Sequence, residues 1–258
     1  MSKEKLKVVK IGGYVVDSPA MLESVLQDFA TLDGKKLLVH GGGRLATKVS
    51  SGLGIETQMV QGRRVTDAQT LKVVTMVYAG WINKSITAKL HSLGLMAWGV
   101  CGADAMIMPA RMRATQNGVD YGFVGDVDSG DVNTEVLSGM LKSGYSVVVA
   151  PITMTRGGQL LNTNADTVAQ SIAVALSEEY EVELIYFFER SGVLADIDDE
   201  ASLIPLIDHT NYCDLKSQGK IFDGMIPKID NALFAVQSGV SAVRICNNLN
   251  QRTGTIII

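Results

Sequence analysis

Residues 10–19, "KIGGYVVDSP", join a predicted strand to a predicted helix through a lysine and two glycines. The apolar run "LKVVKI" leads into this stretch, and Ser18 followed by Pro19 is typical of a helix N-terminus. Glycines leave backbone N–H groups unshielded, while Lys10 and the positive end of the helix dipole add positive potential. The junction therefore suits an anion, although a tight turn without any ligand explains the two glycines equally well.

Outside this stretch, apolar runs of strand length alternate with helical patterns. This alternation predicts further strands at 35–40, 95–100, 145–152, 182–188, 242–246 and 255–258, and helices at 19–32, 44–51, 66–93, 133–143, 210–218 and 225–238. Such an order predicts an α/β fold with a mainly parallel sheet between helices, in which ligands bind beyond the carboxyl ends of the strands.

The segments between these elements carry their own signals. A hairpin is expected at 56–65 around Gly62, and Thr66 with Gln69 predicts a capping box for the long helix that follows. Residues 106–128 are typical of a β-rich insertion that turns at Asn117-Gly118. Residues 153–166 are predicted to form a loop that leads into another helix.

The whole chain excludes several classes of protein. A formal charge of −4 over 258 residues provides no broad basic field, so we expect no nucleic-acid partner. Cys101, Cys213 and Cys246 lie far apart and lack the spacing of a metal site, which favours free thiols in a reducing compartment. Neither a signal peptide nor a membrane span is predicted, and a soluble cytoplasmic protein is expected.

Two predicted strands end in glycine clusters, Gly12-Gly13 and Gly41-Gly42-Gly43. If both clusters lie at the same end of the sheet, their N–H groups converge on one anion. Neither cluster is a phosphate loop of the common nucleotide-binding types, because G-x-x-x-x-G-K-[ST] and a helix-opening G-x-G-x-x-G are both missing.

Three further motifs are candidates for chemistry. "LLNTNAD" at 160–166 gathers amide and carboxylate groups where a loop meets a helix, which helix capping alone also explains. Lys228, in "DGMIPKID", falls on the opening turns of a helix, where a cation is unfavourable unless an anion binds, or where it is simply solvated. Arg63-Arg64 in the hairpin either grips a carboxylate or is exposed.

In this order, "KIGG", "HGGG", "GRRVTD", "LLNTNAD" and "DGMIPK" resemble the amino-acid kinase superfamily, and most closely the N-acetylglutamate kinases, over nearly the full length. "NK" at residues 83–84 and "GFVGDV" at 122–127 are also similar. The resemblance implies a three-layer αβα sandwich with an open, mostly parallel sheet. It implies an N-terminal lobe, residues 1–165, that binds N-acyl-L-glutamate and forms a homodimer, and a C-terminal lobe, residues 166–258, that binds ATP.

The implied reaction moves the γ-phosphoryl group of ATP to a side-chain carboxylate, in arginine and ornithine synthesis. The resemblance implies that Lys10 and Lys228 flank the transferring group, that Asp166 holds both lysines, and that the amides of Gly12, Gly13 and Gly42 contact it. Residues implied to bind the acylglutamate are Gly42, Gly43, Arg64 and Asn162. Magnesium is expected to be held by the nucleotide phosphates, with no dedicated protein ligand.

One region departs from the family pattern: "FFERSGVL" at 187–194 lacks the expected hydroxyl and aspartate residues. The nucleotide-binding residues implied nearby are Glu189, Gly192, Leu194, Lys220 and Phe222. The acyl group stays open between acetyl and a charged group such as succinyl, for which the insertion offers Arg111 and Arg113.

The sequence leaves two alternatives open: another amino-acid or carbamate kinase of the superfamily, and a non-catalytic sensor of acylglutamate or nucleotide. Because the chain starts almost directly at its first strand, the N-terminal helix of arginine-sensitive members is expected to be missing. We therefore expect no inhibition by arginine.

Overall fold

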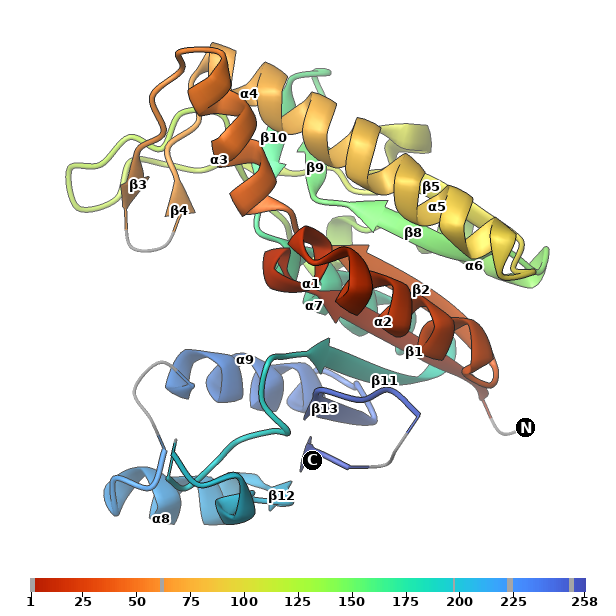
Figure 1. Ribbon diagram of the computed structural model, residues 1–258, viewed down its shortest axis with the longest axis vertical. Coiled ribbons are helices and arrows are strands. Elements are labelled where there is room, and N and C mark those ends of the chain that lie inside the picture. The colour runs from red at the N-terminus through yellow and green to blue at the C-terminus, as the bar shows by residue number, and fades with distance from the viewer. Residues whose placement is uncertain (1–2, 61–62, 197, 222–224, 251–252) are drawn as a thin grey trace.

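The computed structural model describes residues 3–60, 63–196, 198–221, 225–250 and 253–258, and within them eight strands form one sheet (Figure 1). Its order is β12-β14-β13-β11-β1-β2-β8-β5. All neighbouring strands are parallel except β13 and β14, which confirms the mostly parallel sheet. The strands are β1 (Glu4–Ile11), β2 (Lys35–His40), β5 (Ala97–Cys101), β8 (Ser146–Ala150), β11 (Tyr180–Phe187), β12 (Leu206–Ile207), β13 (Ala242–Cys246) and β14 (Thr255–Ile257).

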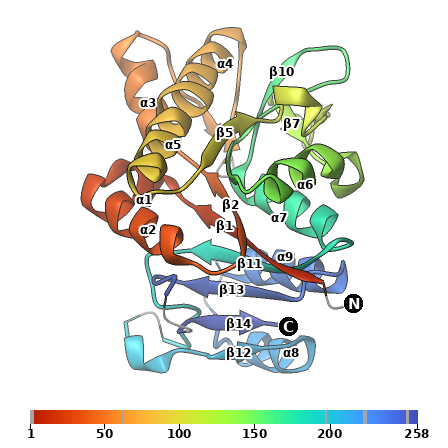
Figure 2. The same ribbon diagram turned by 90° about the vertical axis from the view of Figure 1, so that its right-hand side faces the viewer.

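Helices cover both faces of this sheet, as Figure 2 shows from the side. One apolar core lies beneath α2 (Pro19–Thr31), α3 (Gly43–Gly52), α4 (Ala68–Thr75) and α5 (Asn83–Ser92). A second core lies on the other face, beneath α6 (Thr134–Lys142), α7 (Ala165–Leu176), α8 (His209–Ser217) and α9 (Ile226–Gln237). The three-layer αβα sandwich is therefore confirmed.

Parallel pairing brings three strand ends to one level. Ile11 at the end of β1 is opposite His40 of β2 on one side and Phe187 of β11 on the other. The segments that follow these strands, including both glycine clusters, therefore emerge together at the carboxyl edge of the sheet. This register positions the candidate site.

The long helical segment after the hairpin begins differently from the prediction. Asp67, and not Thr66, caps α4, because its carboxylate accepts a hydrogen bond from the Thr70 amide at 2.7 Å. The Thr66 hydroxyl instead donates to the Arg64 carbonyl at 3.0 Å. A π-helix, η1 (Met76–Ile82), then joins α4 to α5. The predicted capping box was therefore wrong. Because the Thr66 hydroxyl does not cap the helix, its oxygen can accept a hydrogen bond from another segment.

A second, four-stranded sheet corrects the prediction for residues 153–166. This segment is not a plain loop, because β9 (Ile152–Met154) and β10 (Leu160–Thr163) pair as an antiparallel hairpin. β10 also pairs with β7 (Val124–Asp126), which pairs in turn with β6 (Arg111–Met112). The insertion is β-rich as predicted, with its turn at Asn117-Gly118, where both residues have positive φ. Asn162 therefore stands on a strand and not at a loop–helix junction.

A buried histidine holds the segment after β2. His40 is fully buried, and its Nδ1 lies 2.9 Å from the Gly41 carbonyl, while Asn83 Nδ2 lies 3.4 Å from its Nε2. Because a carbonyl only accepts, Nδ1 carries the proton of a neutral ring. Burial is the main cause that lowers the pKa of His40 to about 4 from 6.5.

This burial predicts a pH-dependent stability. His40 takes up a proton near pH 6.5 in the unfolded chain but only near pH 4 in the folded chain, so acidification within that window favours unfolding. Between pH 7 and pH 5, its contribution lowers the free energy of unfolding by about 2 kcal/mol. Urea unfolding of wild type and His40→Gln at both pH values measures this loss, which the variant lacks. An equal loss in both proteins would contradict a buried neutral His40.

Candidate active site

Glycine is required where the backbones after β1 and β2 approach each other. The Gly41 amide donates to the Ile11 carbonyl at 2.9 Å, and a Cβ on Gly41 would lie 3.3 Å from the Gly13 amide nitrogen. A Cβ on Gly42, whose φ is +154°, would collide with the side chain of Ile82 from η1. The two clusters therefore form one backbone surface without side chains, as the sequence predicted for an anion site.

Lys10 and Asp166 form an ion pair at the carboxyl edge of the sheet. Lys10 Nζ lies 2.8 Å from an Asp166 carboxylate oxygen, and the side chains are 16% and 40% exposed. Asp166 stands in the first turn of α7, which Asn164 caps through hydrogen bonds to the Asp166 and Thr167 amides. Burial, with the Asp166 charge, raises the pKa of neighbouring Tyr186. A fixed cation is thus held beside the glycines.

Lys228 reaches the same region from the first turn of α9, as predicted. Its ammonium nitrogen lies 3.8 Å from the centre of the Phe188 ring. Burial lowers the pKa of Lys228, while the Asp166 carboxylate acts in the opposite direction. The structure records an ion pair to Asp166 for Lys10 but, among the described residues, none for Lys228. An aromatic face therefore supports Lys228 in this state of the protein.

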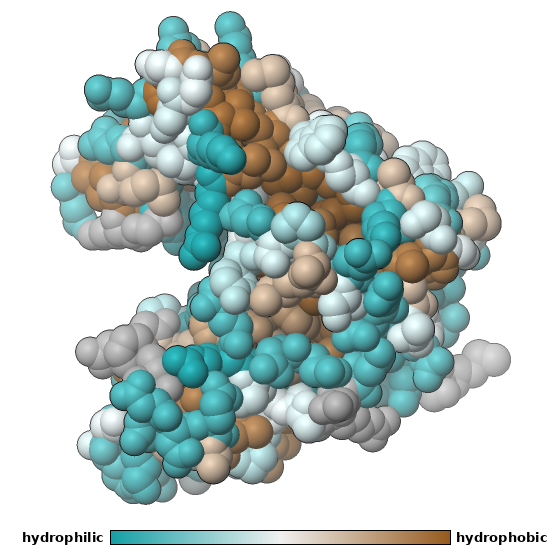
Figure 3. Space-filling model, in the orientation of Figure 1, coloured by the Kyte–Doolittle hydropathy of each residue, from teal (hydrophilic) through white to brown (hydrophobic). Residues whose placement is uncertain are grey.

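Both lysines line one cavity, which we call the lysine cavity. Its wall includes Gly12, Gly13 and Gly43 as well as Lys10 and Lys228. Arg44 and Arg64 also line it. Figure 3 shows the surface deeply hollowed here, between the part of the chain that bears α3 and the part that bears α9. The cavity concentrates positive charge and backbone N–H donors, so it suits a polyanion.

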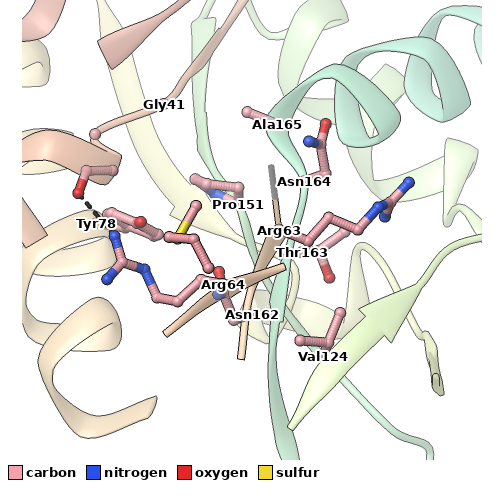
Figure 4. A pocket seen from close by; sticks show the side chains of 13 residues that line it. Gly41, Arg63, Arg64, Tyr78, Val124, Pro151, Asn162, Thr163, Asn164 and Ala165 are labelled. Atoms are coloured by element: carbon pink, nitrogen blue, oxygen red, sulfur yellow. Dashed lines mark hydrogen bonds between the residues drawn. The ribbon is translucent and has the colours of Figure 1, made fainter. Parts of the chain in front are cut away.

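An adjoining cavity, the Asn162 cavity, is lined by Arg63, Arg64, Tyr78, Asn162 and other residues (Figure 4). The Asn162 Nδ2 donates to the Thr66 hydroxyl at 3.0 Å. Because this contact uses the amide nitrogen, the Oδ1 atom of Asn162 remains available as an acceptor. The buried Thr66 therefore orients Asn162 on this wall.

Arg64 connects the two cavities. It is 7% exposed and stands on β4 (Arg63–Arg64), which pairs with β3 (Met59–Val60). Its guanidinium donates to the Gly43 carbonyl at 2.9 Å and to the hydroxyls of Thr47 and Thr57 at 2.9 and 3.1 Å. Three of its five N–H donors are thus used within the protein, and the exposed alternative for Arg64 is excluded.

The predicted nucleotide residues lie in different environments. Glu189 lines the lysine cavity, and Lys220 is exposed. Gly192 and Leu194 are buried, and a Cβ on Gly192 would lie 2.8 Å from the Thr255 amide nitrogen. Phe222 lies outside the described residues, as does Gly62 of the predicted hairpin turn.

The segment that departs from the family pattern is held by its own contacts. Arg190 pairs with Glu200 at 3.0 Å, and the Ser191 hydroxyl donates to the same carboxylate at 2.8 Å. Gly192 packs closely against β14. Arg190, Ser191 and Gly192 therefore hold the loop after β11 in place.

The described residues contain no metal-ligand cluster and no helix that could cross a membrane. Within those ranges, no group of three or more His, Cys, Asp or Glu residues is placed to hold a metal ion. In the same part of the chain, every helix is too short or too polar to cross a membrane.

Comparison with known sequences assigns this chain to one family. The profile of the amino acid kinase family matches residues 5–247, and the chain belongs to that family. Its relatives within the family include acetylglutamate kinases at full length. The enzyme of Cytophaga hutchinsonii is 51% identical over 99% of both chains. That of Methanopyrus kandleri is 38% identical over 98% of this chain and 100% of the other.

Solved structures agree with this fold. The smu.665 protein of Streptococcus mutans is 28% identical, with a TM-score of 0.75 over 98% of each chain. N-acetylglutamate synthase from Neisseria gonorrhoeae, complexed with coenzyme A and N-acetyl-glutamate, has a TM-score of 0.81 at 22% identity. This chain covers 60% of the synthase chain, and at that identity the likeness concerns the fold alone.

Sequence reasoning missed several residues of these cavities. Tyr78 lies against Gly42 and lines the Asn162 cavity. It is a single tyrosine within a helical pattern, and no sequence motif marks it as a site residue. Phe188 was noted only as a departure from the family, whereas its ring supports Lys228. Thr66 was assigned to a helix cap. Their roles follow from distances between segments far apart in sequence.

The surroundings of Lys228 predict its titration. Burial favours its neutral form and lowers its pKa, so Asp166→Asn, which removes the opposing carboxylate, lowers that pKa further. NMR titration of protein labelled with ¹³C at lysine Cε measures the Lys228 pKa in wild type and in Asp166→Asn, and Lys228→Arg assigns the signal. A Lys228 pKa at or above 10.5, or one that rises in Asp166→Asn, would show that burial does not dominate.

Proposed function

We propose that this protein transfers the γ-phosphoryl group of ATP to the side-chain carboxylate of N-acetyl-L-glutamate, or of a closely related N-acyl-L-glutamate, in arginine biosynthesis. The observation that carries the proposal is the Lys10–Asp166 ion pair beside Lys228 and the glycine backbones in one cavity. Full-length identity of 51% to an acetylglutamate kinase supports the same reaction.

The chemistry asks for little beyond position and charge. A carboxylate oxygen of the acceptor attacks the γ-phosphorus, and the bond from that phosphorus to the bridging oxygen breaks, leaving ADP with the electron pair. The acceptor is already ionised at neutral pH, so no general base is needed. The protein holds two anions together and stabilises the charge that spreads over the transferring oxygens.

Each group at the lysine cavity has a role in this scheme. Lys10 and Lys228 neutralise the transferring oxygens from the two sides of the cavity. Asp166 fixes Lys10 and contributes to the field at Lys228. Backbone N–H groups of Gly12 and Gly13 in this cavity, and of Gly42 in the adjoining Asn162 cavity, donate to the phosphoryl group.

The acylglutamate occupies the Asn162 cavity with its side chain directed at the lysine cavity. Arg64 binds the α-carboxylate of the substrate with the N–H donors that have no partner within the protein. The hydrogen bond from Arg64 to the Gly43 carbonyl fixes the guanidinium beside the glycine loop. Asn162, oriented by Thr66, binds the amide region, and Gly42 and Gly43 contact the substrate through their backbones.

ATP enters from the side of β11 and α9, near Glu189, Gly192, Leu194 and Lys220, while Phe222 stays a predicted nucleotide-binding residue outside the described part of the chain. Magnesium arrives with the nucleotide and is held by its phosphates. Residues 1–165 form the lobe for acylglutamate and residues 166–258 the lobe for ATP.

The experiment that tests the reaction is an ADP-release assay with MgATP and five acceptors: N-acetyl-L-glutamate, N-succinyl-L-glutamate, glutamate, aspartate and carbamate. We expect turnover with an acylglutamate only. Turnover with a different acceptor would assign another kinase of the family. Binding without any turnover would favour the sensor, which the altered segment after β11 motivates.

Loss of the fixed cation predicts a kinetic change. Lys10→Ala lowers kcat by ~10²- to 10³-fold and changes KM for the acylglutamate little, because the charge acts mainly in the transition state. Steady-state ADP release measures both constants. Lys89→Ala, which removes a surface ion pair with Glu23, is the matched control and retains wild-type kcat. Wild-type turnover in Lys10→Ala would remove Lys10 from the mechanism.

A homodimer through the β5 edge of the main sheet is also part of the proposal. β5 pairs only with β8 within the described chain, and Met96 and Trp98 at this edge are 53% and 46% exposed. An edge strand with unpaired backbone N–H and C=O groups, beside large exposed apolar side chains, can pair with the same strand of a second copy.

A charge at this edge tests the assembly. Trp98→Glu is expected to give a monomer in sedimentation velocity at micromolar concentration, where wild type is a dimer, because burial of the new carboxylate is unfavourable. Leu206→Glu, at the opposite edge of the same sheet, is the control and leaves the dimer intact. A dimer in Trp98→Glu would place the interface elsewhere.

A further inference from the structure

Arg63 carries a positive charge that has no ion-pair partner among the described residues. It lines the Asn162 cavity, and within the described residues no carboxylate or other polar group pairs with its guanidinium. Its position is half-buried, and burial, reinforced by the charge of Arg113, lowers the pKa of its guanidinium, which nonetheless stays protonated. A partly desolvated cation without a partner is unfavourable unless an anion binds to it.

The two arginines that the sequence offered for a charged acyl group are already engaged. Arg113 forms a two-pronged contact with the carboxylate of Asp126. Arg111 is 70% exposed and lies 3.5 and 3.8 Å from the carboxylates of Asp128 and Asp131. Neither lines the Asn162 cavity. Asp126, the acid whose charge acts on Arg63, is occupied by Arg113, so Arg63 keeps its donors.

Arg63 and Arg64 leave β4 in opposite directions, as neighbours on a strand do. Figure 4 shows Arg64 directed at Tyr78, and Arg63 at the side where Thr163 and Asn164 lie, with Asn162 between the two arginines. In an acylglutamate the amide joins the α-carbon to the acyl group. If Arg64 holds the α-carboxylate and Asn162 the amide, the acyl chain therefore extends toward Arg63.

We propose that Arg63 is a specificity-determining residue that binds a carboxylate at the end of the acyl group. The preferred acceptor is then an N-acyl-L-glutamate whose acyl group is itself acidic, such as N-succinyl-L-glutamate. This inference rests on the proposed function and names the substrate class of the same site. A guanidinium suits the role because it meets a carboxylate with two parallel N–H donors.

The test compares three acceptors in the ADP-release assay: N-acetyl-, N-butyryl- and N-succinyl-L-glutamate. Butyryl matches the four-carbon length of succinyl and replaces its carboxylate with a methyl group. We expect wild-type kcat/KM to be ~10- to 100-fold higher for N-succinyl- than for N-butyryl-L-glutamate, the range of a charge-assisted hydrogen-bond pair.

Arg63→Met keeps the apolar stem and removes the charge. It is expected to abolish that ratio by lowering kcat/KM for the succinyl substrate, while values for the two neutral substrates stay within about threefold of wild type. Arg63→Lys retains part of the preference. Arg111→Met, which removes a nearby charge outside the cavity, leaves the ratio unchanged.

The outcomes separate this inference from the proposed function. Turnover of N-acetyl-L-glutamate without any preference for the succinyl substrate in wild type would overturn the role of Arg63 and leave the kinase intact. An equal loss for all three acceptors in Arg63→Met would show a structural or α-carboxylate role instead, and also overturn it. Turnover of none of the three by wild type would contradict the proposed function itself.

Discussion

The ion pair between Lys10 and Asp166 is the interaction on which the rest of the site depends. A cation that is 16% exposed needs a counter-charge before any ligand arrives, and Asp166 supplies it at 2.8 Å. Asp166 itself is fixed by the start of α7, where Asn164 caps the helix. The pair thus joins the end of β1 to α7, and leaves the positive potential of Lys228 and the glycine amides free to act on incoming anions.

This pair is positioned by the sheet. Parallel pairing of β1 with β2 and β11 sets Ile11, His40 and Phe187 at one level, so the backbones that follow them meet at one edge. The buried His40, through its contact with the Gly41 carbonyl, couples the glycine loop to the core beneath it. Phosphoryl transfer needs no protein nucleophile, and a rigid edge with fixed charges meets its main demands.

Strand periodicity and glycine placement are local signals, and they predicted the mainly parallel α/β sheet and the approach of the two glycine clusters. That Lys10 and Lys228 meet at one place was implied only by the family resemblance. Contacts between distant segments were not predictable. Thr66 had the local pattern of a capping residue, yet it bonds Asn162, 96 positions away. The ring of Phe188, and not Asp166, lies against Lys228. Arg111 and Arg113 were noticed as charges, but only the structure shows their acids and the unmatched Arg63.

The central claim is that Lys10 and Lys228 both contact the transferring phosphoryl group. A crystal structure with MgADP, an N-acylglutamate and aluminium fluoride tests it most directly, because planar aluminium fluoride mimics that group in the transition state. We expect the ammonium groups of Lys10 and Lys228 to form hydrogen bonds with fluorides on the two sides of the aluminium, with Asp166 still bound to Lys10. An aluminium fluoride group seated away from either lysine, or Lys10 released from Asp166 and turned to solvent, would contradict it.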